Sequence, residues 1–317
     1  MTTVREDVLG SPYTAETIPL PDDEEGAVVA TLVRHTGGPG AGRAVLHVHG
    51  FVDYFFQTAY AEWWTARGYD FYALDLRKYG RSLRPHHTPH YVEDLAEHYP
   101  ELDAAWQRIT ERDGHDHVVL SAHSTGGLIV PLWLADHAVP AAGQFLNAPW
   151  FDLQGAWWMR TIGTQLIRQV GPRVPRKEIP REVNGVYGRS LHRDHGGEFD
   201  FNLEWKPLES RPVYVGWLRA IREGHARLHA GLDLAVPTLV LASDRTTTPT
   251  ELDEDAHSSD IVLDVRQIRR WASSVGTHVT SIAVPGARHD VVLSRAPVLK
   301  QVHAELERWL TAYVDPR

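Results

Sequence analysis

Cysteine is absent from this chain of 317 residues. Its absence excludes disulfide bonds, metal sites built on thiolates and a cysteine nucleophile, although it does not fix the cellular compartment. Basic residues are also scarce, because 32 lysines and arginines stand against 41 acidic residues, and the formal net charge is −9. A nucleic-acid-binding surface needs a local basic stripe, and we find none, so nucleic acid is not an expected partner.

Long apolar runs are missing as well. The longest stretch without charged side chains, residues 118–135, is about long enough to span a bilayer. It contains His123, Ser124, two glycines and Pro131, which indicate a buried core instead. The first ten residues lack the basic region and apolar block of a secretory signal peptide. We therefore expect a cytoplasmic protein without stable membrane anchoring.

The composition that remains is ordinary for a globular protein, with 43% hydrophobic and 23% charged residues. The length fits one large α/β domain with an insertion and allows a sizeable buried core.

Segments typical of strands and helices alternate through the first half of the chain. Buried strands are expected at 44–48, 70–76, 118–121 and 142–147, and helices at 56–67, 100–112 and from 127 onward. This alternation predicts a mostly parallel sheet with helices on both faces, whose ligand site lies beyond the carboxyl ends of the strands. Two antiparallel strands, at 14–20 and 27–34, are expected before it, and residues 1–12 are expected to form a loose arm.

The alternation stops at Trp150. Residues 150–232 are expected to form an insertion, or cap, over the strand ends, because much of this segment is rich in proline, glycine, arginine and acidic residues. The core then consists of residues 1–149 and 233–317, with the sheet resuming at 236–242.

The most informative motif is V-V-L-S-A-H-S-T-G-G-L, at residues 118–128. A strand that turns sharply into a helix holds one side chain exposed at the end of the sheet, as in the nucleophile elbow G-x-S-x-G. Here Ala122 and Gly126 are the small residues and Ser124 is the raised residue. The following helix presents its positive dipole end to a developing oxyanion. A serine that merely caps the helix is the alternative interpretation.

His289 follows the last expected strand, in the loop P-G-A-R-H-D, where a general base for Ser124 is expected. Three carboxylates after the preceding strand are candidates for the third member: Asp244, Asp260 and Asp264. We favour Asp260, although a plain helix N-cap would also explain it. Asp264 is expected in the first turn of the next helix, and Asp244 is the second candidate. The order serine, aspartate, histidine is that of enzymes with a nucleophile elbow.

With these motifs in place, the chain resembles the α/β-hydrolase superfamily, in the branch of lysophospholipases, monoacylglycerol lipases and serine aminopeptidase-like hydrolases. The matching segments are His49-Gly50-Phe51, residues 75–82 (D-L-R-K-Y-G-R-S), residues 123–127 (H-S-T-G-G), Asp260-Ile261-Val262 and residues 286–289 (G-A-R-H). The resemblance covers nearly all of the chain except the arm and the cap. The spacing between acid and histidine in this branch also favours Asp260.

Three features depart from the branch pattern: Ala122 stands for a glycine, Lys78 stands where a glycine is usual, and the loop before the acid is longer. The third departure bears on which carboxylate is the acid.

The resemblance implies a serine hydrolase of carboxylic esters that acts on a small-molecule ester through an acyl-enzyme. His289 would deprotonate Ser124, and Asp260 would hold the imidazole. The backbone N–H groups of Phe51 and Thr125 would form the oxyanion hole. No metal and no organic cofactor is implied.

Five further side chains or positions are expected at the substrate: His49, Gly50, His123, Trp157 and Trp158. The two tryptophans have an equally good alternative, which is that one of them only packs the cap onto the core.

Two other functions stay open within this fold. A peptidase or amidase would need acidic cap residues to hold a substrate ammonium, and the available residues are Glu178, Glu182, Glu198 and Glu204. A non-catalytic small-molecule receptor is the other.

A metal site is a weaker alternative. Its candidate ligands would be His86, His87, His90, His192, Asp194 and His195. Their spacing places them on no common helix face, so we expect a solvated loop instead.

Overall fold

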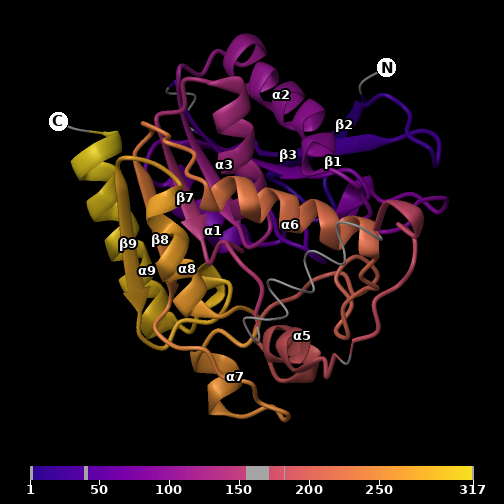
Figure 1. The fold of residues 1–317 in the computed structure, drawn as a ribbon. Helices are drawn as coiled ribbons and strands as arrows, with labels where there is room; N and C mark the ends of the chain where they lie inside the picture. The colour runs from indigo at the N-terminus through magenta and orange to yellow at the C-terminus, as the bar shows by residue number, and fades with distance from the viewer. Residues whose placement is uncertain (1–2, 39–41, 155–170, 182, 316–317) are drawn as a thin grey trace.

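The computed structural model describes residues 3–38, 42–154, 171–181 and 183–315. Nine strands form one sheet in the order β1-β2-β3-β5-β4-β6-β7-β8-β9 (Figure 1). Their bounds are β1 Thr3–Glu6, β2 Tyr13–Pro19, β3 Val29–His35, β4 Arg43–Val48, β5 Asp70–Asp75, β6 His117–His123, β7 Gly143–Asn147, β8 Thr238–Ser243 and β9 Val279–Val284.

The sheet is mostly parallel. Strands β1, β2, β3 and β5 pair antiparallel in succession, whereas every pairing from β5 to β9 is parallel. The central strands β4, β6 and β7 are almost wholly buried, as expected for strands covered by helices on both faces. This is the predicted α/β-hydrolase fold.

The amino-terminal arm differs from expectation. Residues 1–12 were expected to be loose, but Thr3–Glu6 pairs with β2, with Thr3 opposite Thr17. Asp7, which follows the strand, forms a buried ion pair with Arg81, at 2.5 Å between Oδ2 and Nε. The prediction of a loose arm was wrong because this anchor joins residues far apart in the chain.

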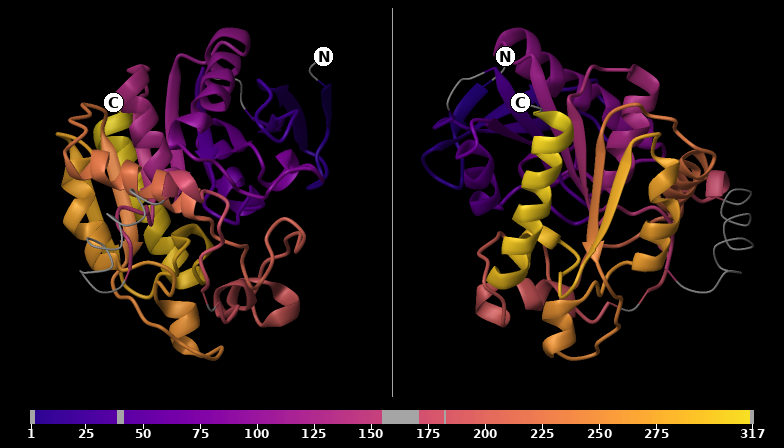
Figure 2. Two further views of the ribbon diagram at one scale, coloured as in Figure 1. Left: turned by 45° about the vertical axis from the view of Figure 1, so that its right-hand side comes forward. Right: turned by 90° about the vertical axis from the view of Figure 1, so that its left-hand side faces the viewer.

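Helices cover both faces of the sheet (Figure 2). One face is packed by α1 (Thr58–Thr65) and α9 (Ala296–Trp309), which contribute Trp64 and Trp309 to one apolar cluster. The other cluster contains the inner faces of α2 (Tyr99–Gln107), α3 (Gly126–His137), α6 (Val215–His229) and α8 (Val265–Trp271). Two π-helical turns, Arg108–Arg112 and Leu310–Val314, extend α2 and α9.

The register brings the carboxyl ends of the central strands to one level. Val48 of β4 is paired with Ala122 of β6, and His123 is paired with Asn147 of β7, which in turn is paired with Leu241 of β8. The loops that leave these strands therefore meet at one edge of the sheet, where ligand sites of open α/β sheets lie.

Between β7 and β8, the described residues contribute no strand to the sheet. This segment contains α5 (Val186–Leu191) and α6, together with short 3₁₀ turns at Gly171–Arg173 and Arg193–His195. Helix α6 lies against α3 so closely that a Cβ on Gly224 would be 3.1 Å from Leu132 Cδ1. The second part of the insertion is thus built into the main core.

Helix α5 lies beyond the end of the sheet beside α7 (Glu254–Ser258), as Figure 1 shows. Trp157 and Trp158 lie outside the described residues.

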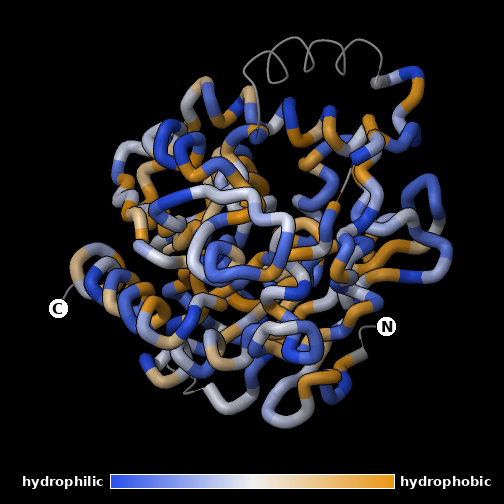
Figure 3. The backbone as a smooth tube through the Cα atoms, turned by 90° about the horizontal axis from the view of Figure 1, so that it is seen from below, coloured by the Kyte–Doolittle hydropathy of each residue, from blue (hydrophilic) through white to orange (hydrophobic). Residues whose placement is uncertain are grey.

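Hydrophilic and hydrophobic stretches alternate along the chain in short runs (Figure 3). In the described part of the chain, none of the helices has the length and apolar character needed to cross a membrane.

Candidate active site

Ser124 lies at the sharp turn between β6 and α3. Its φ is +51°, a left-handed conformation that non-glycine residues adopt rarely and that is characteristic of strained functional turns. The Ser124 amide donates to Asn147 O at 3.0 Å, and its carbonyl accepts from Trp150 N at 2.9 Å. These bonds to the chain leaving β7 hold the turn in place.

Two glycines are required by the crowding around this turn. A Cβ on Gly126 would lie 2.5 Å from His49 O, and a Cβ on Gly50 would lie 2.9 Å from Ser124 Cβ. Both distances are too short for real side chains, so the loops after β4 and β6 can approach only because these residues are glycines. Ala122, which stands for the usual glycine, is fully buried in the core.

His289 connects Ser124 to a carboxylate. Its Nε2 lies 3.1 Å from Ser124 Oγ, and its Nδ1 lies 2.9 Å from Asp260 Oδ2. All three residues are buried, with Ser124 the most accessible at 7% and Asp260 at 0%. The structure therefore brings together serine, histidine and aspartate in one hydrogen-bonded chain, from three separate strand ends.

The geometry separates the three candidate carboxylates. Asp260 accepts from Val262 N at 2.8 Å and Leu263 N at 2.7 Å through Oδ1, which leaves Oδ2 for His289. Asp264 caps α8 and binds Arg266 instead. Asp244 is half-buried, and its Oδ1 accepts from Gly286 N at 3.3 Å.

The longer loop before the acid is closed at its neck. Asp260 N donates to Arg245 O at 3.1 Å, and Thr247 N donates to Asp260 O at 3.2 Å. The Thr246 hydroxyl adds a bond to Leu263 O at 2.8 Å. Residues 247–259 thus form an excursion that returns to the end of β8, and Asp260 lies there despite its distance along the chain.

A polar network anchors the loop that carries His289. Asp290 accepts from Asn147 Nδ2 at 2.6 Å and from Gln57 Nε2 at 3.2 Å, while Asn147 Oδ1 accepts from Val291 N at 2.9 Å. All of these groups are buried. The ends of β7 and of the β4–α1 loop therefore hold the histidine loop directly.

The N–H groups of Phe51 and Thr125 are free of acceptors within the described part of the chain. Both residues line the same cavity as Ser124. Val52, next to Phe51, has a φ of +52°, which is unusual for a β-branched residue and marks a second strained position at the site.

The cavity at Ser124 has a volume of about 690 Å³, within the range of small-molecule sites. Its walls come from the loop after β4, the elbow, the insertion and the segment after Asp260. Leu208, Pro249 and Ile261 are among its apolar lining residues. The only carboxylate among the described lining residues is Asp53.

Asp53 is paired with Lys206 from the insertion, at 2.8 Å between Oδ1 and Nζ, and both side chains are buried. Burial acts to raise the pKa of Asp53, but the Lys206 charge and hydrogen bond, together with His123 and His49, outweigh it, and the pKa lies below its usual value. Burial lowers the pKa of His123, so this imidazole stays neutral at the cavity wall.

Asp53, His123 and Asp290 have potential ligand atoms within 4.8 Å of one another, the one such set among the described residues. The Lys206 ammonium already lies against Asp53, and amides already bind Asp290. The six residues considered as metal ligands from the sequence do not form such a set in the described structure. His87, for example, binds Ala27 O at 3.0 Å.

Of the other predicted substrate contacts, His123 lines the cavity, whereas His49 and Gly50 are not among its lining residues. His49 Nδ1 lies 2.8 Å from Gly50 O, and its Nε2 accepts from Leu76 N at 3.1 Å, which joins the ends of β4 and β5.

Asp53, Lys206 and Tyr187 were not predicted. The Tyr187 ring packs edge-on to His289 at 5.6 Å between centroids. Asp53 follows the H-G-F segment and could have been noticed there, but nothing in the sequence marks Lys206 or Tyr187.

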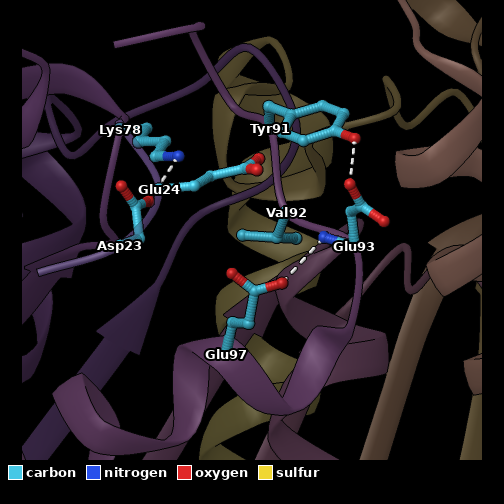
Figure 4. Close-up of a pocket in the computed structure, with 7 residues that line it drawn as sticks. All are labelled: Asp23, Glu24, Lys78, Tyr91, Val92, Glu93 and Glu97. Carbon is cyan, nitrogen blue, oxygen red and sulfur yellow. Dashed lines mark hydrogen bonds and ion pairs between the residues drawn. The ribbon is translucent and has the colours of Figure 1, made fainter. Parts of the chain in front are cut away.

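A second cavity, of about 350 Å³, shares no lining residue with the first (Figure 4). Lys78 enters it, buried, and pairs with Asp23 at 2.6 Å and Glu25 at 2.8 Å. Lys78 has a φ of +64°, which explains why a glycine would be expected at this position.

Comparisons with known proteins bear on the fold and the family. Solved structures with the same fold include a soluble variant of monoglyceride lipase from Saccharomyces cerevisiae in complex with a substrate analogue, with a TM-score of 0.68, 14% identity, and coverage of 93% of this chain and 94% of that one. Monoacylglycerol lipase from Paleococcus ferrophilus gives a TM-score of 0.63 and 18% identity, with coverage of 87% of this chain and 96% of that one.

A carboxyl esterase from Bacillus coagulans in complex with glycerol gives a TM-score of 0.64 and 12% identity, with coverage of 95% of this chain and 99% of that one. No curated protein matches the chain. The sequence model of the serine aminopeptidase S33 family matches residues 40–295, which is most of the chain. The chain therefore belongs to the serine aminopeptidase S33 family, with an α/β-hydrolase fold.

Proposed function

We propose that the protein hydrolyses carboxylic esters of small molecules through an acyl-enzyme on Ser124. The observation that carries this proposal is the buried chain Asp260–His289–Ser124, whose serine opens into a cavity large enough for a small ester.

In the first half of the reaction, Ser124 Oγ attacks the ester carbonyl and His289 Nε2 takes its proton. Asp260, held by two backbone amides, keeps the proton of the neutral imidazole on Nδ1 and stabilises the imidazolium. The Phe51 and Thr125 amides donate hydrogen bonds to the carbonyl oxygen as it becomes negatively charged. One such donor typically stabilises the transition state by about 2.7–4 kcal/mol. The imidazolium then protonates the departing alcohol.

In the second half, His289 takes a proton from water, and the resulting hydroxide attacks the acyl carbon. Collapse of this second intermediate expels Ser124 Oγ, which regains its proton from His289, and the carboxylic acid leaves. None of these steps needs a metal or an organic cofactor.

Esters are favoured over aminoacyl substrates by the charges of the cavity. An aminopeptidase needs a carboxylate to hold the substrate ammonium, and the sole described lining carboxylate, Asp53, is already paired with Lys206. Glu178 and Glu204 are exposed and do not line the cavity, nor does Glu198, which pairs with Arg288. Glu182 lies outside the described residues. The names of the lipase and esterase structures support the same choice.

We infer that residues 150–232 act as a cap that determines which acyl and alcohol groups enter. Several residues from this part of the chain, including Arg181 and Leu208, line the same cavity as the elbow.

The test is hydrolysis of p-nitrophenyl esters from acetyl to dodecanoyl, set beside aminoacyl p-nitroanilides. Ser124→Ala should abolish ester turnover, whereas Ser281→Ala, at an exposed serine on β9, should leave it unchanged. Labelling by a serine-reactive fluorophosphonate without ester turnover would instead favour a receptor of the same fold. Faster turnover of the anilides would favour the aminopeptidase.

A further inference from the structure

Lys206 lies in an unusual place for a lysine. It is 6% exposed, and its ammonium is 2.8 Å from Asp53 Oδ1. The same ammonium lies 5.7 to 5.8 Å from the ring centroids of Phe56, Tyr187 and Phe201. Burying a long charged side chain is costly unless it is paired, so this arrangement stabilises one definite position of the ammonium.

The partner of Lys206 lies two residues after the proposed oxyanion donor. Phe51, Val52 and Asp53 follow one another, and Val52 between them has a φ of +52°. A β-branched residue in this left-handed region is strained and persists only where its surroundings hold it. Without an anchor at Asp53, the backbone would relax toward negative φ at Val52, and the adjoining Phe51 amide would reorient.

On the core side, the loop after Asp53 is held by β5 and by the turn that follows β5. Phe55 N donates to Asp75 Oδ1 at 3.0 Å, and Phe55 O accepts from Arg81 Nη1 at 3.0 Å. These bonds act two residues beyond Asp53.

On the other side, the loop is held by the segment of the insertion that carries Lys206. Asn202 N donates to the Tyr54 hydroxyl at 2.7 Å, and the ring of Trp205 packs edge-on to Tyr54 at 5.1 Å. The rings of Phe56 and Phe201 lie 5.1 Å apart. Residues 199–206 therefore hold residues 53–56, and among these contacts the Lys206–Asp53 pair is the nearest in sequence to Phe51, whose own ring packs on Trp217 at 4.3 Å between centroids.

We propose that Lys206 is a positioning residue for the reaction: through Asp53, it holds the strained Phe51–Val52 backbone so that the Phe51 amide points at the developing oxyanion. The insertion thereby completes the catalytic site as well as covering it. This inference rests on the proposed function.

The first experiment is steady-state hydrolysis of one p-nitrophenyl ester by Lys206→Met and Asp53→Asn. Because losing one oxyanion donor typically costs about 10²–10³-fold in kcat, a misdirected donor should cost about 10- to 100-fold. KM should change by less than about two-fold, since the interaction is made only in the transition state. Lys300→Met, at an exposed lysine on α9, is the matched control and should match the wild type.

The second experiment is rescue by Val52→Gly in the Lys206→Met background. Glycine adopts positive φ without the penalty that valine has, so the loop no longer depends on the anchor. The double variant should recover about five-fold or more of the kcat that Lys206→Met alone loses. A lysine that only stabilises the folded protein would show no such rescue.

Three results would overturn the proposal: kcat of Lys206→Met within about three-fold of wild type, a raised KM with unchanged kcat, or no rescue by Val52→Gly. Circular dichroism checks that each variant is folded, and Asp53→Asn, which preserves side-chain size, replaces Lys206→Met if that variant unfolds. If wild type turns over no ester, the rate constant for fluorophosphonate labelling of Ser124 replaces kcat in every comparison. Failure of the proposed ester hydrolysis is thus distinguished from failure of the positioning role proposed for Lys206.

Discussion

Replacing Asp260 with asparagine should lower kcat for ester hydrolysis by about 10³–10⁴-fold. Two backbone amides bind Asp260 Oδ1, at 2.8 and 2.7 Å, and Oδ2 faces His289 Nδ1 at 2.9 Å. An asparagine side chain will keep its oxygen on the two amides, so its NH₂ group will face His289. The imidazole must then carry its proton on Nε2, where it cannot accept the proton of Ser124.

The magnitude follows from two effects. A carboxylate and an imidazolium whose charges lie about 4 Å apart interact by about 4 kcal/mol at an effective dielectric constant of about 20, which is about a thousand-fold in rate. The wrong tautomer adds to this loss; in a well-studied Ser-His-Asp triad the same exchange costs about 10⁴-fold.

Asp244→Asn is the matched control, since Asp244 follows the same strand, is half-buried and accepts only a 3.3 Å bond from Gly286 N. It should retain kcat within about three-fold, because a neutral amide oxygen can accept the same bond. The assay is initial-rate hydrolysis of a p-nitrophenyl ester, with thermal unfolding to verify the fold. A loss smaller than ten-fold for Asp260→Asn, or a larger loss for Asp244→Asn, would refute the assignment of the acid.

Three further outcomes can be measured on the same protein. Lys78→Met should lower the free energy of unfolding in urea by about 2–4 kcal/mol, because Asp23 and Glu25 lose their buried counter-charge; a loss below about 0.5 kcal/mol would contradict this. Burial, with the nearby Arg222 charge, lowers the pKa of His225 to about 3. The contribution of neutral His225 to the free energy of unfolding should therefore be complete above pH 6.5 and fall by about 1.4 kcal/mol per pH unit below it. His225→Gln should flatten the pH dependence of unfolding by about one proton between pH 6 and 4, and an unchanged slope would count against neutral burial. Arg181 lines the cavity with no carboxylate in ion-pair distance among the described residues, so Arg181→Gln should lower kcat/KM for a hemisuccinate ester about five-fold relative to the butyrate ester; equal losses on both esters would exclude a charge effect.

Much of the arrangement of the candidate site could be predicted because its signals are local. The elbow around Ser124 joins a buried strand to a helix within a few residues, and His289 lies in a short loop after the last strand. Strand alternation then places both at the same edge of the sheet. The strain at Ser124 and the small residues around it are consequences of that one turn.

Other features depend on contacts between distant residues and carry no local pattern. Lys206 and Asp53 are separated by 153 residues, and the anchor between Asp7 and Arg81 by 74. Residues 199–206 alternate apolar and polar side chains, F-D-F-N-L-E-W-K, but this pattern does not indicate that the lysine is buried, since its burial depends on the apolar cluster around Phe56 and Phe201. The choice between Asp244 and Asp260 likewise required the course of the loop between them.

Because the loop is closed at its neck, at Thr246 and Asp260, its length does not affect the position of the Asp260 carboxylate. The hydrogen bonds that fix Asp260 come from Arg245, Val262 and Leu263, outside the excursion of residues 247–259, and from Thr247 at its first residue. Residues can therefore be gained or lost after Thr247 in that excursion without moving the carboxylate from His289. Because Thr248, Pro249 and Thr250 in its first part line the cavity, the loop is a place where substrate preference can diverge while the reacting groups stay fixed.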